Sequence, residues 1–262
     1  MLRRQLLLSI PALVLPLRAQ ALELADAINQ AGRQRMLSQR MGKAWLALAL
    51  GIEPVAAKRV LSKSMALFER QLLDLQAHAP TPDLRQTYQQ LDVAWRDYQR
   101  ALLDGDSSGT PREAQASAVL AADAKVLALS HQGTVQYEAV LAKPVGQLVN
   151  LAGRQRMLSQ RMAKLYLATG LTGQADAAAD MAQSRTEFVN AMATLRQAPQ
   201  TTPRIRDALQ LADGQWVFFD AALQRMHTSA RSAKAGSEVF VTSENLLSVM
   251  DMVTGLYSGM QA

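Results

Sequence analysis

The chain has 262 residues, of which 49% are hydrophobic and 5% aromatic, and its formal net charge at pH 7 is +6. It contains no cysteine, which excludes disulfides, metal thiolates and thiol nucleophiles together. The basic residues form no tract interleaved with aromatic side chains, so the charge gives no case for nucleic-acid binding. Abundant Ala, Leu, Gln and Met with few aromatic residues predict an all-α protein.

The first 21 residues have the three-part pattern of an export signal. The pair Arg3-Arg4 precedes an apolar run from Leu6 to Leu17, and Ala19-Gln20-Ala21 offers a small-residue cleavage site. The run is short for a membrane span and contains two prolines, so a retained anchor is the less favoured interpretation. We expect cleavage after Ala21 and a soluble periplasmic protein, exported by the general or the twin-arginine route. Losing the three arginines of this segment lowers the formal charge from +6 to +3.

Beyond Leu22 the hydrophobic pattern is helical, and clusters of Gly and Pro interrupt it. In the first half, helices are expected over about 22–50, 54–79, 83–103 and 112–142, with the longest loop at 104–111. The second half repeats this order at an offset of 120 or 121 residues, so that Trp95 corresponds to Trp216 and Tyr137 to Tyr257.

Four helices of similar length joined by short loops indicate an up-down four-helix bundle. The sequence therefore predicts an export segment at 1–21 and two tandem four-helix units at 22–142 and 143–262. Only Pro144 and Gly146 mark the boundary between the units. Pro144 either separates two helices there or kinks one helix that passes from the first unit into the second.

One sixteen-residue stretch occurs in both units. Residues 28–43 read INQAGRQRMLSQRMGK and residues 149–164 read VNLAGRQRMLSQRMAK, with 13 of 16 positions identical. A helix that only fills a core tolerates exchange among Leu, Met and Ile as long as volume is conserved. Because the copies keep their Arg and Gln residues as well, we expect this stretch to do more than fill space.

On a helical projection each copy forms a narrow seam, aliphatic or small except at its centre. The seams consist of Leu24, Ile28, Ala31, Arg35, Gln39, Gly42, Leu46 and Ala49 in the first copy, and of Val145, Val149, Ala152, Arg156, Gln160, Ala163, Leu167 and Gly170 in the second. A second face with Leu37, Met41, Trp45 and Leu48 is expected to pack into the core of the bundle. Arg33 and Arg40 share a third face with Asn29, for which a solvated surface is the favoured interpretation.

The two seam arginines, Arg35 and Arg156, have no acidic neighbour on their own helices. No acidic residue occurs between Asp26 and Glu53, or between Glu138 and Asp176. An unpaired buried charge is strongly destabilising, so either acids from another helix or a bound anion must neutralise these arginines. The planar, forked guanidinium matches a flat oxyanion such as a carboxylate or nitrate.

The stretch I/V-N-x-A-G-R-Q-R-M-L-S-Q-R-M resembles the first-helix signature of PilJ-type sensor domains, the N-terminal periplasmic part of type IV pilus chemotaxis transducers. It is more distantly similar to the nitrate-binding segment of nitrate/nitrite sensor histidine kinases. The resemblance covers the whole chain after the export segment, as two copies. In the kinases the anion lies between two subunits on a pseudo-symmetric axis. The resemblance therefore implies that two copies in one chain form this interface intramolecularly.

Residue by residue, the resemblance implies that Arg35 and Arg156 contact the ligand and that the backbone of Gly32 and Gly153 lies close to it. We add Gln39 and Gln160 of the seams as secondary contacts. Further candidates near these positions are Asn29, Arg33, Arg40, Asn150, Arg154 and Arg161.

The expected function is a non-enzymatic periplasmic sensor of nitrate, nitrite or a small carboxylate that passes its state to a membrane-bound signalling or transport partner, without a cofactor or metal. The alternative is a structural or adaptor bundle whose repeated face docks a receptor or pilus component. An enzyme is the least favoured class. His78, His131 and His227 do not recur at matching positions and lack metal-ligand spacing, and no nucleophile elbow occurs. Scattered histidines of this kind are expected at the solvated surface.

Overall fold

A computed structural model of the chain describes residues 24–104, 112–172, 177–225 and 232–260. These residues form eight α-helices and no strand: α1 (Leu24–Ala49), α2 (Pro54–Ala77), α3 (Pro82–Leu103), α4 (Arg112–Leu141), α5 (Pro144–Thr172), α6 (Ala177–Gln197), α7 (Pro203–Gln224) and α9 (Ala233–Ser258). The all-α prediction is confirmed. The predicted cleavage site after Ala21 lies outside the described residues. None of the helices in these ranges is long and apolar enough to cross a membrane.

The helices begin and end at the residues that the sequence marks. Thr81 and Thr202, at matching positions of the two units, cap α3 and α7 by accepting the backbone N–H of Leu84 and Ile205 at 3.2 and 3.3 Å. A proline follows each threonine at the first helical position, where its missing N–H is not needed.

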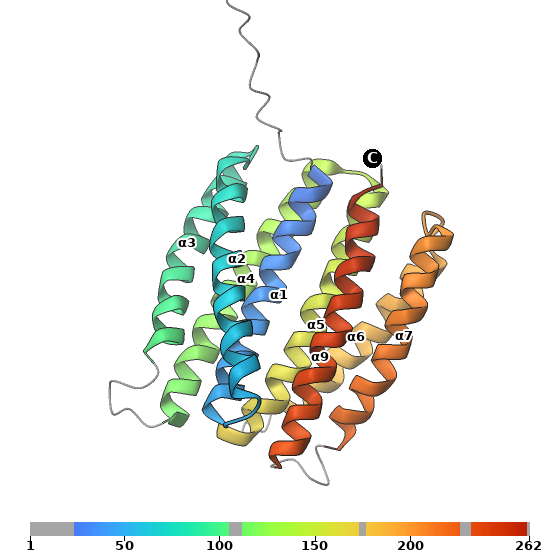
Figure 1. The fold of residues 1–262 in the computed structure, drawn as a ribbon. Coiled ribbons are helices and arrows are strands. Elements are labelled where there is room, and N and C mark those ends of the chain that lie inside the picture. Colours follow the sequence, from blue (N-terminus) through green and yellow to red (C-terminus); the bar gives the residue numbers. More distant parts are fainter. Residues whose placement is uncertain (1–23, 105–111, 173–176, 226–231, 261–262) are drawn as a thin grey trace, which may run out of the picture.

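The connection between the units is a helix break. α4 ends at Leu141, Ala142 has a left-handed φ of 50°, and α5 starts at Pro144. In Figure 1 the chain reverses direction at this point, so α4 and α5 run antiparallel. The sequence left two alternatives at Pro144, a break between helices or a kink in one continuous helix. The kinked helix is wrong, because the chain already reverses at Ala142, before the proline.

Each half of the chain forms an up-down four-helix bundle, α1–α4 in one and α5, α6, α7 and α9 in the other (Figure 1). The bundles lie side by side. α1 and α5 run in the same direction at the centre and pack against each other, while α4 also contacts α5 and α9 also contacts α1. The predicted pair of tandem four-helix bundles is confirmed, and the repeated stretches lie at the junction between them.

Matching contacts inside the two bundles confirm the duplication. The Phe68 and Trp95 rings lie 4.4 Å apart between centroids, and the corresponding Phe188 and Trp216 rings 4.3 Å apart. The hydroxyl of Tyr137 donates to the carbonyl of Leu75 at 3.0 Å, and that of Tyr257 to the carbonyl of Leu195 at 3.2 Å.

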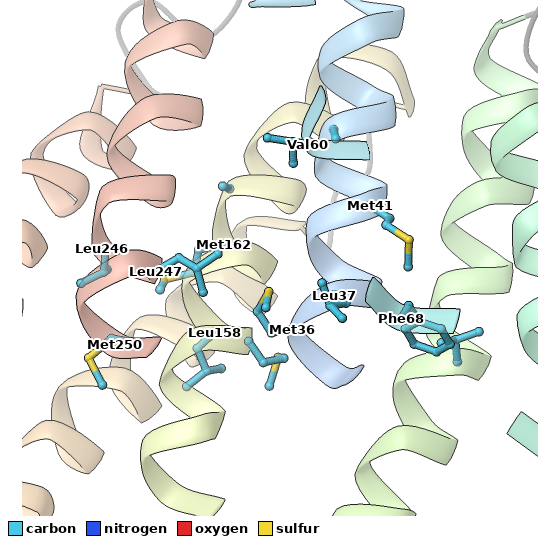
Figure 2. Packing of buried hydrophobic residues seen from close by; sticks show 14 of the residues in the cluster. Met36, Leu37, Met41, Val60, Phe68, Leu158, Met162, Leu246, Leu247 and Met250 are labelled. Carbon is cyan, nitrogen blue, oxygen red and sulfur yellow. The ribbon is translucent and has the colours of Figure 1, made fainter. Parts of the chain in front are cut away.

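The second apolar face of the repeated stretch packs as predicted. Figure 2 shows Leu37 and Met41 of α1 beside Phe68 of α2, while Leu158 and Met162, their counterparts on α5, lie toward Leu246, Leu247 and Met250 of α9. Trp45 is buried as well, and Leu48 is half-buried. Each repeated helix therefore has one side in its own bundle core and leaves its seam for the junction.

Candidate functional site: an arginine pair between the bundles

The seams of α1 and α5 meet at the junction, and Arg35 and Arg156 are 1% and 0% exposed there. A Cβ atom added to Gly32 would lie 3.2 Å from Nη2 of Arg35 and 3.6 Å from Nη2 of Arg156. A Cβ added to Gly153 would lie 3.2 Å from Nη2 of Arg156 and 3.7 Å from Nη2 of Arg35. The two guanidinium groups thus lie together, beside both glycines.

This arrangement brings four of the expected site residues together and gives the glycines a role that differs from the expected one. The sequence interpretation gave Gly32 and Gly153 close approach to an anion. In the structure the space left by the missing side chains is taken by the guanidinium nitrogens themselves. The glycines therefore allow two large cationic side chains to fit between closely packed helices.

The contacts of the pair are reciprocal across the junction. Nη2 of Arg35 donates to the side-chain oxygen of Asn150 at 2.7 Å and to its carbonyl at 3.4 Å. Nη2 of Arg156 donates to the carbonyl of Asn29 at 3.0 Å. Asn29 and Asn150 are matching positions of the repeat, so the junction resembles the isologous interface of a homodimer.

The Nη1 atoms of the two arginines, in contrast, have different kinds of partner. Nη1 of Arg156 donates to Oδ1 of Asp251 on α9 at 2.5 Å, whereas Nη1 of Arg35 lies 3.3 Å from Nδ1 of His131 on α4. Positions 131 and 251 correspond at the repeat offset of 120 residues. Among the residues that the structure describes, Arg156 forms a salt bridge and Arg35 forms none.

The polar groups around the pair differ between the two sides in the same way. Asp251 also accepts from Nη2 of Arg33 at 2.9 Å, so it bridges two guanidinium groups. Arg154, the counterpart of Arg33, donates instead to Glu187 on α6 at 2.6 and 3.2 Å. The amide of Asn150 donates to Glu138, which places that carboxylate one residue away from Arg35.

The pKa values follow from this asymmetry. Burial, together with the charges of Arg154 and Arg156, lowers the pKa of Arg35 to about 9 against the opposing effect of Glu138. Burial lowers the pKa of Arg156 to about 10, and Asp251 opposes that shift. Both arginines remain protonated at neutral pH. Arg35 is the less compensated of the two.

His131 is neutral at neutral pH, since burial and then the charges of Arg35 and Arg154 lower its pKa. The sequence interpretation placed the histidines at the solvated surface. His131 is exposed as a residue, yet its Nδ1 contacts a buried guanidinium, so that interpretation missed its part in the site. The repeat offset, which aligns His131 with Asp251, is the signal that could have found both residues.

The other predicted site residues lie outside the pair. Nε2 of Gln39 donates to Asp123 at 2.8 Å, and Nε2 of Gln160 donates to the carbonyl of Ser243 at 2.9 Å. Neither glutamine has a hydrogen bond to the arginine pair within the described ranges. Arg161 pairs with Asp180 at 3.1 Å at the edge of the second bundle.

Arg33 and Arg40 are not on a solvated face. Their side chains are each 22% exposed, and they pair across the junction with Asp251 and Glu244 of α9. The interpretation as a solvated surface is wrong because α9 of the second bundle covers this face of α1.

Two further ion pairs cross the junction and were not foreseen. Lys43 of α1 donates to Glu244 of α9 at 2.7 Å, and Lys164 of α5 donates to Asp123 of α4. The lysines are the last residues of the repeated stretch, and each reaches the other bundle. Together with the arginines they place buried polar contacts in a junction whose apolar seam residues, such as Ile28 and Val149, belong to one hydrophobic cluster that spans both bundles.

The buried cations retain free hydrogen-bonding capacity. Nε of Arg35 and Nε of Arg156 have no hydrogen-bond partner among the residues that the structure describes. In the same ranges, no group of His, Asp or Glu side chains has the arrangement of a metal site. Guanidinium groups of this kind are donors that suit an oxyanion.

The chain matches the model of a known protein family. The model of the family described as "Type IV pili methyl-accepting chemotaxis transducer N-term" (PilJ) matches residues 17–127 and 142–241. Each matched segment contains one copy of the sixteen-residue stretch. No curated protein and no solved structure matches the chain at a significant level.

Proposed function

Because the chain belongs to the PilJ family of chemotaxis-transducer sensor domains, we propose that it is a non-enzymatic periplasmic sensor of a small planar anion, of the size of nitrate or nitrite. It passes its bound state to a membrane-bound signalling or transport partner. The anion binds at the arginine pair of Arg35 and Arg156, with one anion per chain.

One observation carries this proposal. Two buried guanidinium groups, one from each bundle, lie beside the same two glycines, and among the described residues only that of Arg156 has a carboxylate in direct contact. A buried charge without a counterion is costly, and an anion that accepts from a guanidinium removes that cost. The positive charge and the N–H groups of the pair support the proposal of a flat oxyanion as the ligand.

The location of the pair suits transmission of a signal. Arg35 belongs to the first bundle and Arg156 to the second, and their hydrogen bonds cross between α1 and α5. A ligand shifts a conformational equilibrium only by its differential affinity for the two states. An anion bound to Arg35 has such a difference, because Arg35 also donates to Asn150 of the second bundle and lies beside Arg156, so its position depends on how the bundles are placed relative to each other.

The adaptor alternative loses its original basis. In that alternative the repeated face docks another helix of a receptor or pilus component. The two repeated faces instead cover each other, and Ile28, Arg35, Leu46, Val149 and Arg156 are all buried between or beneath the central helices. The face that would dock a partner is therefore occupied within the chain.

Isothermal titration of the purified protein with nitrate, nitrite and acetate tests the proposal. Arg35→Ala should weaken nitrate binding by about one to two decades, since a hydrogen bond to a charged group contributes about 1.5–3 kcal/mol. Arg156→Ala should also weaken it, because the substitution removes a positive charge beside the site and leaves the carboxylate of Asp251 paired with Arg33. Arg161→Ala, on the same helix but paired with Asp180, is the control and should bind as the unaltered protein does. Flat titrations with all three anions would refute the proposal.

A further inference from the structure

The duplication provides an internal comparison of the two sides of the arginine pair. Arg35 matches Arg156 and Asn150 matches Asn29, so the donors are the same on both sides. The residues facing these donors from α4 and α9 differ. His131 stands where α9 has Asp251, and Glu138 stands where α9 has Ser258.

On the Arg156 side, a carboxylate of the protein already does what a bound oxyanion would do. Oδ1 of Asp251 accepts from Nη1 of Arg156 at 2.5 Å and from Nη2 of Arg33 at 2.9 Å. Burial opposes the ionisation of Asp251, but these two arginines hold the pKa of its carboxyl below its usual value. On this side a carboxylate of the chain therefore contacts the buried arginine directly.

On the Arg35 side, the same position carries a neutral imidazole. His131 contacts Nη1 of Arg35 at 3.3 Å but brings no negative charge. Arg154, which corresponds to Arg33, is engaged by Glu187. The carboxylate of Glu138 is held by the amide of Asn150, and it raises the pKa of Arg35 without forming a salt bridge to it among the described residues.

Positions 131 and 251, here called the rim positions, are also the part of this site that solvent reaches. Arg35 itself is 1% exposed, whereas His131 is an exposed residue and the side chain of Asp251, its counterpart, is 43% exposed. An anion that reaches His131 from solution is therefore next to a side chain that contacts Nη1 of Arg35.

We infer that the anion site is one-sided: a small planar monoanion binds at Arg35 beside His131, in the place that Asp251 fills at Arg156. This inference rests on the proposed function and adds to it which half of the pair is open. The ligand class is that of the carboxylate it mimics, with two oxygens in one plane, as in nitrate, nitrite, formate or acetate. Stoichiometry of one per chain then follows from the difference between His131 and Asp251, not from a ligand placed on the pseudo-symmetry axis.

Exchanging the two rim residues tests the inference, with nitrate as the probe and isothermal titration as the measurement. His131→Asp installs the internal carboxylate on the open side, so nitrate affinity should fall by at least about tenfold. Asp251→His opens the second side, and the stoichiometry should rise from one nitrate per chain to two. His131→Asp that binds nitrate unchanged, or Asp251→His that still binds one, would overturn the inference.

A second measurement guards against variants that are too unstable to titrate. Asp251→Asn removes only the charge, so added nitrate should raise its melting temperature by more than it raises that of the unaltered protein. The matched control is Asp180→Asn, which breaks the Arg161 pair at a side chain of similar exposure, 46%. A nitrate effect on Asp251→Asn no larger than that on Asp180→Asn would also overturn the inference.

The outcomes separate the inference from the function on which it rests. No nitrate, nitrite or acetate binding by the unaltered protein refutes the proposed function, and the inference with it. Binding by the unaltered protein that is insensitive to the exchange of His131 and Asp251 refutes the inference alone.

Discussion

The ion pair between Asp123 and Lys164 should contribute measurably to the stability of the whole chain. Asp123 of α4 is fully buried and accepts from Lys164 of the other bundle and from Gln39 at 2.8 Å. Asp123→Asn keeps the shape and an acceptor for Gln39 but leaves the ammonium of Lys164 without its carboxylate. Removing one partner of a buried pair costs about 3–5 kcal/mol.

We expect a cost at the lower end of the range of about 3–5 kcal/mol, because the side chain of Lys164 is 10% exposed and its ammonium can be partly hydrated. We therefore expect Asp123→Asn to lower the free energy of unfolding by about 3 kcal/mol and the melting temperature by about 6–12 °C for a chain of this size. Denaturant and thermal unfolding followed by far-ultraviolet circular dichroism measure both quantities.

The comparison variants define what would refute this reasoning. Asp213→Asn breaks an ion pair with Arg196 in which both side chains are more than 40% exposed, and it should cost less than about 1 kcal/mol. Replacing both partners, as in Asp123→Leu with Lys164→Met, should recover most of the loss because no unpaired charge remains. If Asp123→Asn cost no more than Asp213→Asn, the crossing pair would not be a stabilising contact between the bundles.

Three further predictions concern pH and hydrogen bonding. Burial would raise the pKa of Glu244, but Lys43 and Arg40 lower this pKa from 4.5 to about 2. The ionised carboxylate therefore adds stability that is complete above about pH 4.5 and is lost as the pH falls toward 2. Glu244→Gln should accordingly flatten the loss of melting temperature over this acidic range, and an unchanged slope would contradict the assignment. Burial and the charges of Arg35 and Arg154 lower the pKa of His131. Because a bound anion favours the protonated imidazole, nitrate should bind more tightly at about pH 5.5 than at about pH 7.5. His131→Asn should remove this dependence in titrations at the two pH values. Tyr137→Phe removes the bond to the Leu75 carbonyl and should cost about 1 kcal/mol in denaturant unfolding. Tyr257→Phe removes the bond to the Leu195 carbonyl and also the 2.7 Å hydrogen bond with the hydroxyl of Thr201, so it should cost more; equal losses would mean that the Thr201 contact adds no stability.

The sequence by itself determined the secondary structure, the duplication and the central place of the arginines. Helical periodicity, the breakers at the loops and the threonine–proline pairs before α3 and α7 act over a few residues, so they can be read without knowing the fold. The offset between the two halves also aligned the residues that later proved to make matching contacts, such as Tyr137 and Tyr257. The same periodicity separated the seam of Arg35 from the face of Leu37 and Met41.

The tertiary structure decided what covers each face. Asp251 reaches Arg156 from 95 residues away, and Glu244 reaches Lys43 from 201 residues away. The sequence left open whether acids from another helix or an anion would neutralise the seam arginines; the structure supplies an acid at Arg156 and none in contact with Arg35 among the described residues. It also showed that Gln39 and Gln160, expected near the ligand, donate to Asp123 and to the carbonyl of Ser243.

The physical reason for this division is the range of the interactions. A hydrophobic stripe predicts which side of a helix leaves water, because the apolar pattern is set by the residues of that helix. Which helix it meets, in which direction and at which height depends on the packing of side chains from both partners. The parallel contact of α1 and α5, and with it the difference between His131 and Asp251 at one arginine pair, exists only once the two bundles are packed together.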